Sequence, residues 1–417
     1  MNDFVYKNGE LFAEGCRVAD IVAEVGTPVY IYSQETLERH YRVFDEALAG
    51  LKHLITFSVK SNSNLAVLRL FARLGSGADI VSGGELFRCL RAGIPPEKIV
   101  FSGVGKTEDE ISFALETGIM MFNVESEMEM ERIEDVAARK GKVAPVAIRV
   151  NPDIDPQTHP YISTGLRKNK FGIDVKRALA LYKKAASRES LRVIGIDCHI
   201  GSQLTTLSPF EETVLKLREM AETLEKEGIS LEWVDMGGGL GITYNDETPP
   251  TPMDYGRVIR QAAEGMSQGF IFEPGRVIAG NAGILVTRVL YVKQGMEKKF
   301  LVVDAGMNDM IRPSLYGAYQ EILPVKQTTE RVRADVVGPI CESGDFLAKD
   351  REVPFVAPGG LMSVMSAGAY GFTMASNYNS RPRPAEVMVH GNRFSVIRRR
   401  ETYEDLVRGE EIPSWLS

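Results

Sequence analysis

Short β-rich runs alternate with amphipathic segments between residues 33 and 280, and this alternation constrains the fold more than any other feature. The eight runs are Ile55–Lys60, Ala78–Ser82, Ile99–Gly103, Met121–Ser126, Val143–Asn151, Val193–Gly201, Leu231–Gly239 and Phe270–Arg276. Eight strand–helix units in about 250 residues are what a closed (β/α)8 barrel requires. A doubly wound open sheet is the rival, but no GxGxxG motif follows the first run.

The intervening segments carry helix signals. Ser208-Pro209-Phe210-Glu211 predicts a capping box with proline at the first helical position, and Gly228 is expected to close that helix. A second capping box, from Ser82 to Glu85, is expected to open the helix that follows the second strand.

The pattern changes after residue 280. Strands are expected at Ile284–Val292, Phe300–Val303, Val332–Val337, Val353–Val356 and Glu386–Val389, with few helices between them. Pro354 makes the fourth of these an edge strand at best. Strand-like Phe4–Lys7 and Val29–Ile31 are assigned to the same β-rich part. We therefore expect an α/β protein with a barrel over residues 33–280 and a mostly β domain made of residues 1–32 and 281–417.

Charge and hydropathy exclude several classes of function. The 417 residues include 49 Lys and Arg against 56 Asp and Glu, a net charge of −7, so there is no basic excess for coating nucleic acid. The start, MNDFVYKNGELFAEG, lacks a basic region followed by an apolar core, so no secretory signal is expected. The most apolar stretch, from Gly269 to Val292, contains charged residues that a membrane span would not tolerate.

The four cysteines, Cys16, Cys89, Cys198 and Cys341, are widely scattered. No CxxC pair or Cys/His ligand spacing is present, so no metal site is expected. Unclustered thiols suit a reducing cytoplasm.

Active sites of barrels lie at the C-terminal ends of the strands. Those ends bring together one lysine, one histidine and two glycine-rich turns, without the carboxylate pair of a glycosidase or the GxSxG of an esterase. Backbone N–H groups of Gly237–Gly239 and Gly275, with the Ser202 hydroxyl, could hold a phosphate. The alternative is that these glycines merely end strands.

Lys60 ends the first predicted strand and His199 follows the sixth. A surface lysine and a core histidine are the ordinary alternatives. A partly desolvated lysine at a barrel mouth is instead suited to Schiff-base chemistry, with the imidazole as a stacking surface. Lysine, phosphate site and flat ring point to pyridoxal phosphate. Strictly, these residues alone support only a phosphate-bearing cofactor on a barrel.

Nine motifs in order cover nearly the whole chain: FSVKSNSN, DIVSGGEL, HPYISTGLRKNKFGI, HIGSQ, DMGGGLGI, FEPGR, RPSLYGAY, CESGD and AGAYG. In this order they resemble the diaminopimelate decarboxylase family, a branch of the fold-type III pyridoxal-phosphate decarboxylases with an alanine-racemase-like barrel. The lysine motif departs slightly from the alanine-rich run of many relatives, and its lysine is unaffected.

The resemblance implies a set of cofactor contacts. Lys60 would bind pyridoxal 5'-phosphate as a Schiff base, His199 would stack on its ring, and Glu273 would pair with the ring nitrogen. The phosphate would be held by Ser202, Gly238, Gly239, Gly275, Arg276 and Tyr370.

The resemblance also implies the substrate, meso-2,6-diaminopimelate, which loses CO2 to give L-lysine in the last step of lysine biosynthesis. Arg276, Arg312 and Tyr316, with Tyr370, would bind the substrate around its distal carboxylate, and Glu342 its distal ammonium. Cys341 would donate a proton, delivered with Glu342 from the neighbouring subunit of a cytoplasmic homodimer.

Two alternatives remain at this stage. One is a related decarboxylase for carboxynorspermidine, arginine or a carrier-linked glutamate, against which the distal Arg/Tyr/Glu set argues. The other is a non-catalytic, partner-binding homologue, against which the retained Lys60, His199, Glu273 and Cys341 argue.

Overall fold

The computed structural model describes residues 2–154 and 170–416, and contacts divide the chain into two compact units. One unit is Glu38–Ile278, and the other combines Met1–Leu37 with Ala279–Ser417. The motif HPYISTGLRKNKFGI lies mostly outside the described residues, which resume at Lys170.

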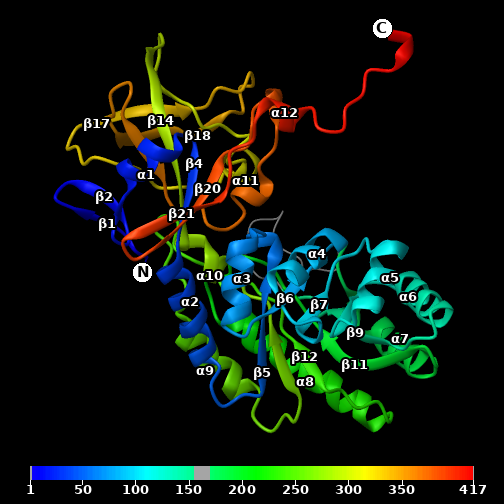
Figure 1. Cartoon of the computed structure of the whole chain (residues 1–417). Coiled ribbons are helices and arrows are strands. Elements are labelled where there is room, and N and C mark those ends of the chain that lie inside the picture. Colours follow the sequence, from blue (N-terminus) through cyan, green and yellow to red (C-terminus); the bar gives the residue numbers. More distant parts are fainter. Residues whose placement is uncertain (1, 155–169, 417) are drawn as a thin grey trace. The chain divides into compact units, whose positions relative to one another are not determined.

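The first unit is a closed barrel of parallel strands (Figure 1). Its strands are β5 (His53–Ser58), β6 (Gly77–Ile80), β7 (Ile99–Phe101), β8 (Met121–Val124), β9 (Ala144–Asn151), β11 (Leu191–Asp197), β12 (Trp233–Asp235) and β13 (Gly269–Phe272). Pairing of β13 with β5 and of β8 with β9 closes the ring, and the short β10 (Ile173–Asp174) pairs with β9. The predicted (β/α)8 barrel is confirmed.

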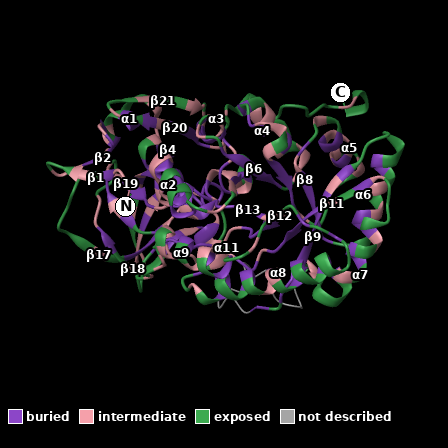
Figure 2. Cartoon of the chain, turned by 90° about the horizontal axis from the view of Figure 1, so that it is seen from below, coloured by how far each residue is buried: buried purple, intermediate pink, exposed green. Residues whose placement is uncertain are grey.

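Helices alternate with these strands and surround them (Figure 1). They are α2 (Gln34–Ala47), α3 (Leu65–Arg73), α4 (Gly83–Ala92), α5 (Glu108–Thr117), α6 (Glu127–Arg139), α7 (Val175–Ala186), α8 (Ser208–Lys226), α9 (Pro252–Ala262) and α10 (Arg276–Ala279). Figure 2 shows the barrel strands largely buried, whereas the helices expose their outer faces. This is the amphipathic pattern expected of helices that cover a sheet.

The helix starts differ from the predicted capping boxes. At α4 the Ser82 hydroxyl accepts from the Glu85 N–H (3.2 Å) as predicted, but the Glu85 carboxylate accepts from the Val81 N–H instead of closing the box. At α8 the predicted box is wrong, because the helix starts at Ser208 and Leu207 is its cap, without a side-chain hydrogen bond. The carbonyl of Leu207 already accepts from the next turn, so the chain is helical before the serine.

Several strands end before their predicted limits. β5 ends at Ser58, and Lys60 lies in a 3-10 turn, Val59–Ser61. β12 ends at Asp235, whose carboxylate accepts from the Gly237 N–H (3.0 Å) and turns the backbone away from the sheet. The candidate side chains therefore lie on the turns beyond the strands, where loops rather than the barrel wall orient them.

The barrel interior has two chemically different layers. An apolar cluster of Val100, Met121, Ala147, Ile194 and Ile271 fills part of it. Nearer the C-terminal strand ends stand buried polar side chains: Asp79, Asn123, Arg149, Asp197 and Asp235. Buried charges persist only where partners compensate them, so this layer marks the functional end of the barrel.

The second unit is mostly β, as predicted. A three-stranded sheet contains β1 (Phe4–Lys7), β2 (Glu10–Ala13) and β3 (Cys16–Arg17). The larger sheet contains β4 (Val29–Ser33), β14 (Gly283–Gln294), β15 (Lys299–Val303), β16 (Ile322–Pro324), β17 (Arg331–Val337), β18 (Phe346–Pro354), β19 (Leu361–Val364), β20 (Ala385–His390) and β21 (Arg393–Arg398). Its helices are α1 (Val18–Val25), α11 (Arg312–Tyr316) and α12 (Tyr403–Leu406), and short 3-10 turns occupy Pro96–Lys98, Gly280–Ala282, Phe372–Met374, Tyr378–Ser380 and Ser414–Leu416 along the chain.

The N-terminal strand β4 is central to this sheet, since it pairs antiparallel with β14 and parallel with β20. A shared apolar core that includes Leu11, Ile21, Ile31, Val286 and Val387 joins the N-terminal segment to the C-terminal strands. Pro354 ends β18, which is an edge strand as predicted, although it starts earlier, at Phe346.

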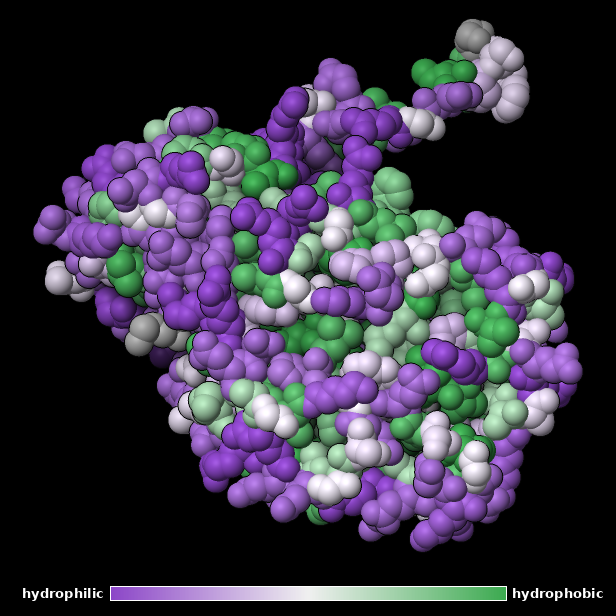
Figure 3. Space-filling view, turned by 60° about the horizontal axis from the view of Figure 1, so that its bottom comes forward, coloured by the Kyte–Doolittle hydropathy of each residue, from purple (hydrophilic) through white to green (hydrophobic). Residues whose placement is uncertain are grey.

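Hydrophilic side chains predominate on the face shown in Figure 3, with hydrophobic ones in small patches. Within residues 2–154 and 170–416, no helix combines the length and apolarity needed to cross a membrane.

Candidate active site

Lys60 follows β5 and forms an ion pair with Asp79 at the end of β6. The lysine side chain is 37% exposed, whereas the Asp79 side chain is fully buried. The Ser58 hydroxyl donates to the same Asp79 oxygen, Oδ2 (2.8 Å). The other oxygen, Oδ1, is buried and has no hydrogen-bond partner among the described residues. The amine is therefore reachable from solvent yet held by a fixed carboxylate.

Glu273 follows β13, and its side chain is buried. Burial, and then the neighbouring carboxylates of Asp235 and Asp79, raises the pKa of Glu273 well above its ordinary value, while Lys60 opposes the shift. Burial likewise raises the pKa of Asp235 to about 6. A carboxyl of this kind is a strong hydrogen-bonding partner for a cationic N–H group.

His199 follows β11, and its Nδ1 accepts from the Gly238 N–H (3.2 Å). Burial, assisted by the positive charges of Arg149 and Lys60, lowers the pKa of His199 well below its ordinary value. The ring is therefore neutral near pH 7. Gly237, at φ +61°, is so close that a β-carbon there would lie 2.7 Å from Nδ1. A neutral ring fixed in this way offers a flat stacking surface.

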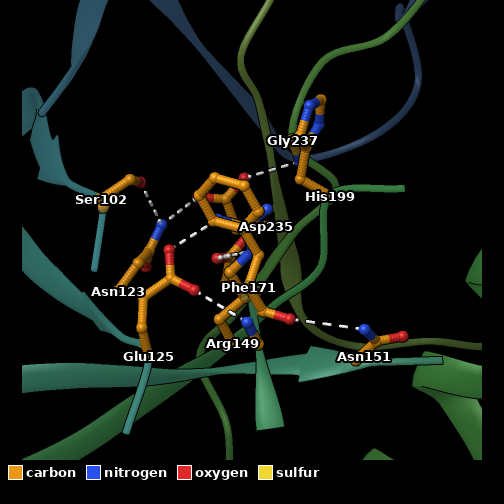
Figure 4. A network of polar contacts seen from close by, with 12 residues as sticks. Ser102, Asn123, Glu125, Arg149, Asn151, Phe171, His199, Asp235 and Gly237 are labelled. Atoms are coloured by element: carbon orange, nitrogen blue, oxygen red, sulfur yellow. Dashed lines mark hydrogen bonds and ion pairs between the residues drawn. The ribbon is translucent and has the colours of Figure 1, made fainter. Parts of the chain in front are cut away.

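Arg149 and its partners border this region (Figure 4). Its guanidinium donates to Glu125 Oε1 (2.6 Å) and lies 3.8 Å from Asp197 Oδ2. The guanidinium also lies 5.0 Å from the centre of the Phe171 ring. Each buried carboxylate beside Arg149 reduces the cost of burying its charge.

The predicted anion-binding groups meet beside Glu273. The Arg276 guanidinium donates to the Ser202 hydroxyl (3.0 Å) and to the Tyr244 hydroxyl (2.7 Å). Gly238 allows close backbone approach, because a β-carbon there would lie 2.3 Å from the Glu273 carbonyl oxygen. The other two glycines of the set, Gly239 and Gly275, are also confined, though less tightly: a β-carbon would lie 2.7 Å from Gly201 O and 3.0 Å from Ser58 Cβ, respectively.

These barrel residues fit pyridoxal 5'-phosphate. The described strand ends supply an accessible amine, a neutral ring, a buried carboxyl and a set of N–H, hydroxyl and guanidinium donors. An aldehyde, a pyridine ring and a phosphate require these four kinds of partner. The orphaned Asp79 Oδ1 leaves one further acceptor at the same place.

In the second unit, Arg312 and Tyr316 lie on α11, with the guanidinium 5.8 Å from the centre of the tyrosine ring. When its amide is oriented to satisfy both ends, buried Gln320 accepts from Arg312 Nε (3.3 Å) and donates to the Met365 carbonyl (2.6 Å). Tyr370 has a left-handed backbone, φ +55°, which for a bulky residue costs energy. The Gln320 amide therefore orients the Arg312 guanidinium, and Gln320 lies just outside the RPSLYGAY motif.

Cys341 and Glu342 are exposed on the loop between β17 and β18. Buried Asp345 anchors this loop by accepting from the Met307 and Ile340 N–H groups (2.6 Å each). The Cys341 N–H donates to the Asn379 side chain (2.9 Å). The loop is thus fixed through its backbone. Its two candidate side chains are exposed, and that of Glu342 hydrogen-bonds the Tyr378 hydroxyl.

Sequence reasoning missed several residues of the barrel site, namely Asp79, Asn123, Arg149, Asp235 and Tyr244. Four of them interrupt apolar strand runs, and a polar residue inside a buried strand is a signal that could have identified them. Tyr244 lies on a loop and carries no such signal.

The family model described as "Pyridoxal-dependent decarboxylase, pyridoxal binding domain" matches residues 34–280. A curated diaminopimelate decarboxylase of Pseudomonas aeruginosa is 53% identical over 413 residues, covering 99% of each chain. The crystal structure of the M. jannaschii diaminopimelate decarboxylase in complex with L-lysine has a TM-score of 0.95 and 40% identity, covering 100% of this chain and 99% of that one. The Helicobacter pylori enzyme, also with L-lysine, has a TM-score of 0.91 and 45% identity, covering 94% of this chain and 98% of that chain.

Proposed function

The chain belongs to the diaminopimelate decarboxylases of the pyridoxal-dependent decarboxylase family, and we propose that it converts meso-2,6-diaminopimelate to L-lysine and CO2. The observation that carries this proposal is the likeness to diaminopimelate decarboxylases over the full length of both chains. The cofactor is pyridoxal 5'-phosphate, and the reaction is that of a carboxy-lyase.

Bound pyridoxal phosphate supplies an electrophilic aldehyde and a ring that accepts the electrons left when a carboxylate departs as CO2. Lys60 binds the cofactor through its Nζ, which must first lose a proton. Asp79, ion-paired with that amine, is the acceptor placed to take it. The partial exposure of Lys60 would leave its Nζ accessible to a substrate amine.

Three further groups of the barrel hold the cofactor. His199 packs its neutral ring against the pyridine plane, and Glu273 binds the ring nitrogen through its carboxylate. The phosphate is held by Ser202 and the backbone of Gly238, Gly239, Gly275 and Arg276, together with Tyr370. The hydrogen bonds from Arg276 to Ser202 and Tyr244 support this assignment, because they fix the hydroxyl at the phosphate end.

The substrate contacts follow from the molecule's second amino-acid end. Arg276, Arg312 and Tyr316 bind the distal carboxylate, and Tyr370 contributes to the same substrate site. Glu342 binds the distal ammonium. Lysine and ornithine lack the second carboxylate, so the arginine side chains would have no negative group to bind and would repel the distal ammonium. These amino acids should therefore react poorly.

Cys341 returns a proton to the carbon that has lost CO2, after which its thiol is reprotonated from solvent. We place Cys341 and Glu342 in the active site of the other chain of a homodimer. Their exposure on a backbone-anchored loop supports this assignment, since a partner-facing donor must project from its own chain. The cytoplasm is the proposed location, in keeping with four unpaired thiols.

A CO2-release assay tests the proposal with meso-, LL- and DD-diaminopimelate, lysine, ornithine and arginine as substrates. The proposal expects release from meso-diaminopimelate with L-lysine as product, and little from the others. Preferred release from lysine, ornithine or arginine would overturn it.

A further inference from the structure

A chain of buried hydrogen bonds runs inside the barrel from Asp235 to Glu273. Asn123 Nδ2 donates to Asp235 Oδ2 (3.0 Å) and to Ser102 Oγ (3.1 Å). The Ser102 hydroxyl in turn lies 3.4 Å from Glu273 Oε1. Figure 4 shows Asn123 between Ser102 and Asp235, joined to each by a dashed line. Each of the four side chains is at least nine-tenths buried, so water cannot replace these contacts.

The donor direction in this chain is determined by Asp235. Its Oδ1 accepts from the Gly237 N–H (3.0 Å), and its Oδ2 accepts from Asn123. Reversing the Asn123 amide would place its oxygen 3.0 Å from an Asp235 carboxylate oxygen, and the two would repel. It would also move the NH2 group to the position of Asn123 Oδ1, which has no hydrogen-bond partner among the described residues. Asn123 therefore donates both of its hydrogens.

This direction decides where the Ser102 proton points. The Ser102 oxygen already accepts from Asn123, and a hydroxyl has a single proton to donate. The acceptor within reach is Glu273 Oε1. A hydrogen bond donated to a carboxylate favours its ionised form. Glu273 also shares a direct side-chain hydrogen bond with Asp235.

Glu273 needs this support because most of the charge around it is negative. The charged and titratable groups that face it are Asp79, Asp197 and Asp235 together with Lys60, and Arg149 and His199 lie in the same layer. The carboxylates oppose ionisation of Glu273, whereas the Ser102 donor favours it.

We propose that Asn123 and Ser102 are positioning residues that hold Glu273 as an oriented carboxylate for the ring nitrogen. This inference rests on the proposed function, in which Glu273 is the ring-nitrogen partner. Asn123 acts through Ser102, and Ser102 acts through Glu273.

The test compares the Ser102→Ala, Asn123→Asp and double variants with Glu273→Gln. Asn123→Asp keeps the size of the side chain but presents the Ser102 hydroxyl with an acceptor, which turns its proton away from Glu273. Ser76→Ala is the matched control, because Ser76 is also buried in the barrel but its hydroxyl has backbone carbonyl oxygens of Ile55 and Gly77 as its possible acceptors.

We expect each single variant to lower kcat about 10-fold with little change in KM, a typical cost of losing an outer hydrogen bond to a functional side chain. The double variant should be no slower than the slower single variant, because both act on one group. The absorbance spectrum of bound cofactor should shift in the same direction as in Glu273→Gln, and the cofactor dissociation constant should rise. Ser76→Ala should change neither the spectrum nor kcat.

Wild-type kcat, spectrum and cofactor affinity in folded Ser102→Ala would overturn the inference, as would fully additive effects in the double variant. If Ser102→Ala does not fold, the isosteric Asn123→Asp decides by the same readouts. Failure of the proposed function is distinguishable, because it appears as absent CO2 release in the wild-type chain or as a Glu273→Gln variant with unchanged spectrum and rate.

Discussion

The barrel and the β-rich unit differ in how far their candidate side chains are surrounded by buried groups. In the barrel, Lys60, His199 and Glu273 emerge beside buried charges, and for the latter two the pKa departs strongly from its ordinary value. In the β-rich unit, Cys341 and Glu342 are exposed on a loop whose backbone is anchored by Asp345, and the Glu342 side chain hydrogen-bonds Tyr378. The difference matches the proposed roles, in which the barrel groups bind a cofactor and the loop groups act in the site of a second chain.

The largest effect is expected from the barrel lysine. Lys60→Ala should abolish essentially all CO2 release and the yellow colour of lysine-bound cofactor, because it removes the candidate amine that is ion-paired with Asp79. Lys52→Ala is the control, since Lys52 is exposed at the start of the same strand and packs on Trp233. A normal spectrum in Lys60→Ala would contradict the assignment.

The next prediction tests whether the two units act across subunits. Cys341→Ala alone should lose nearly all activity, yet mixing it with Lys60→Ala should restore some. If exchange is random, half of the dimers are mixed and one of their two sites has both residues, so about a quarter of wild-type activity should return. Mass-tagged subunits must first show that exchange occurs. No recovery after proven exchange would mean that Cys341 acts within its own chain.

The buried carboxyl of the barrel should matter less than the lysine. Glu273→Gln should retain cofactor but lower kcat about 100-fold, because an amide cannot act as the ionised partner of the ring nitrogen. Steady-state CO2 release measures this effect, with Glu232→Gln as an exposed control for the loss of one negative charge. Full activity in Glu273→Gln would assign the ring nitrogen to another group.

The smallest effect concerns a buried carboxyl in the β-rich unit. Burial raises the pKa of Asp309 to about 7 from an ordinary value of 3.8. The folded chain then binds the proton more tightly than the unfolded chain, so stability falls as pH rises from about 4 through 7. Thermal unfolding of Asp309→Asn should show a smaller loss of midpoint temperature over this range than wild type.

Asp350→Asn is the control for that experiment. Asp350 is exposed, and its hydrogen bond from Arg333 lowers its pKa, so its titration lies below the range tested. Its slope should therefore match wild type. An equal slope in wild type and Asp309→Asn would show that the buried carboxyl does not titrate in this window.

Sequence patterns predicted the barrel because its evidence is local. Each strand is a short apolar run followed by a turn residue, and each helix shows its own periodicity. The predicted start of the helix at Ser208 was wrong, because the Leu207 carbonyl accepts from the Phe210 and Glu211 N–H groups and no side chain caps the helix. The early end of β12 was missed because it depends on one hydrogen bond between Asp235 and Gly237.

The candidate residues divide in the same way. Lys60, His199, Glu273 and the glycines could be proposed as candidates from the sequence, since strand ends and motifs mark them directly. Asp79, Asn123, Ser102 and Asp235 were not assigned roles, because the side chains with which theirs hydrogen-bond lie 19 or more residues away in the sequence.

The sequence by itself determined the order of strands and helices and which residues are the candidate reactive groups, because both are encoded in neighbouring residues. Only the tertiary structure decided which carboxylates share the barrel interior and which way the Asn123 amide points. The physical reason is that protonation and donor direction depend on burial and on partners distant in sequence, which barrel closure alone brings within hydrogen-bond distance.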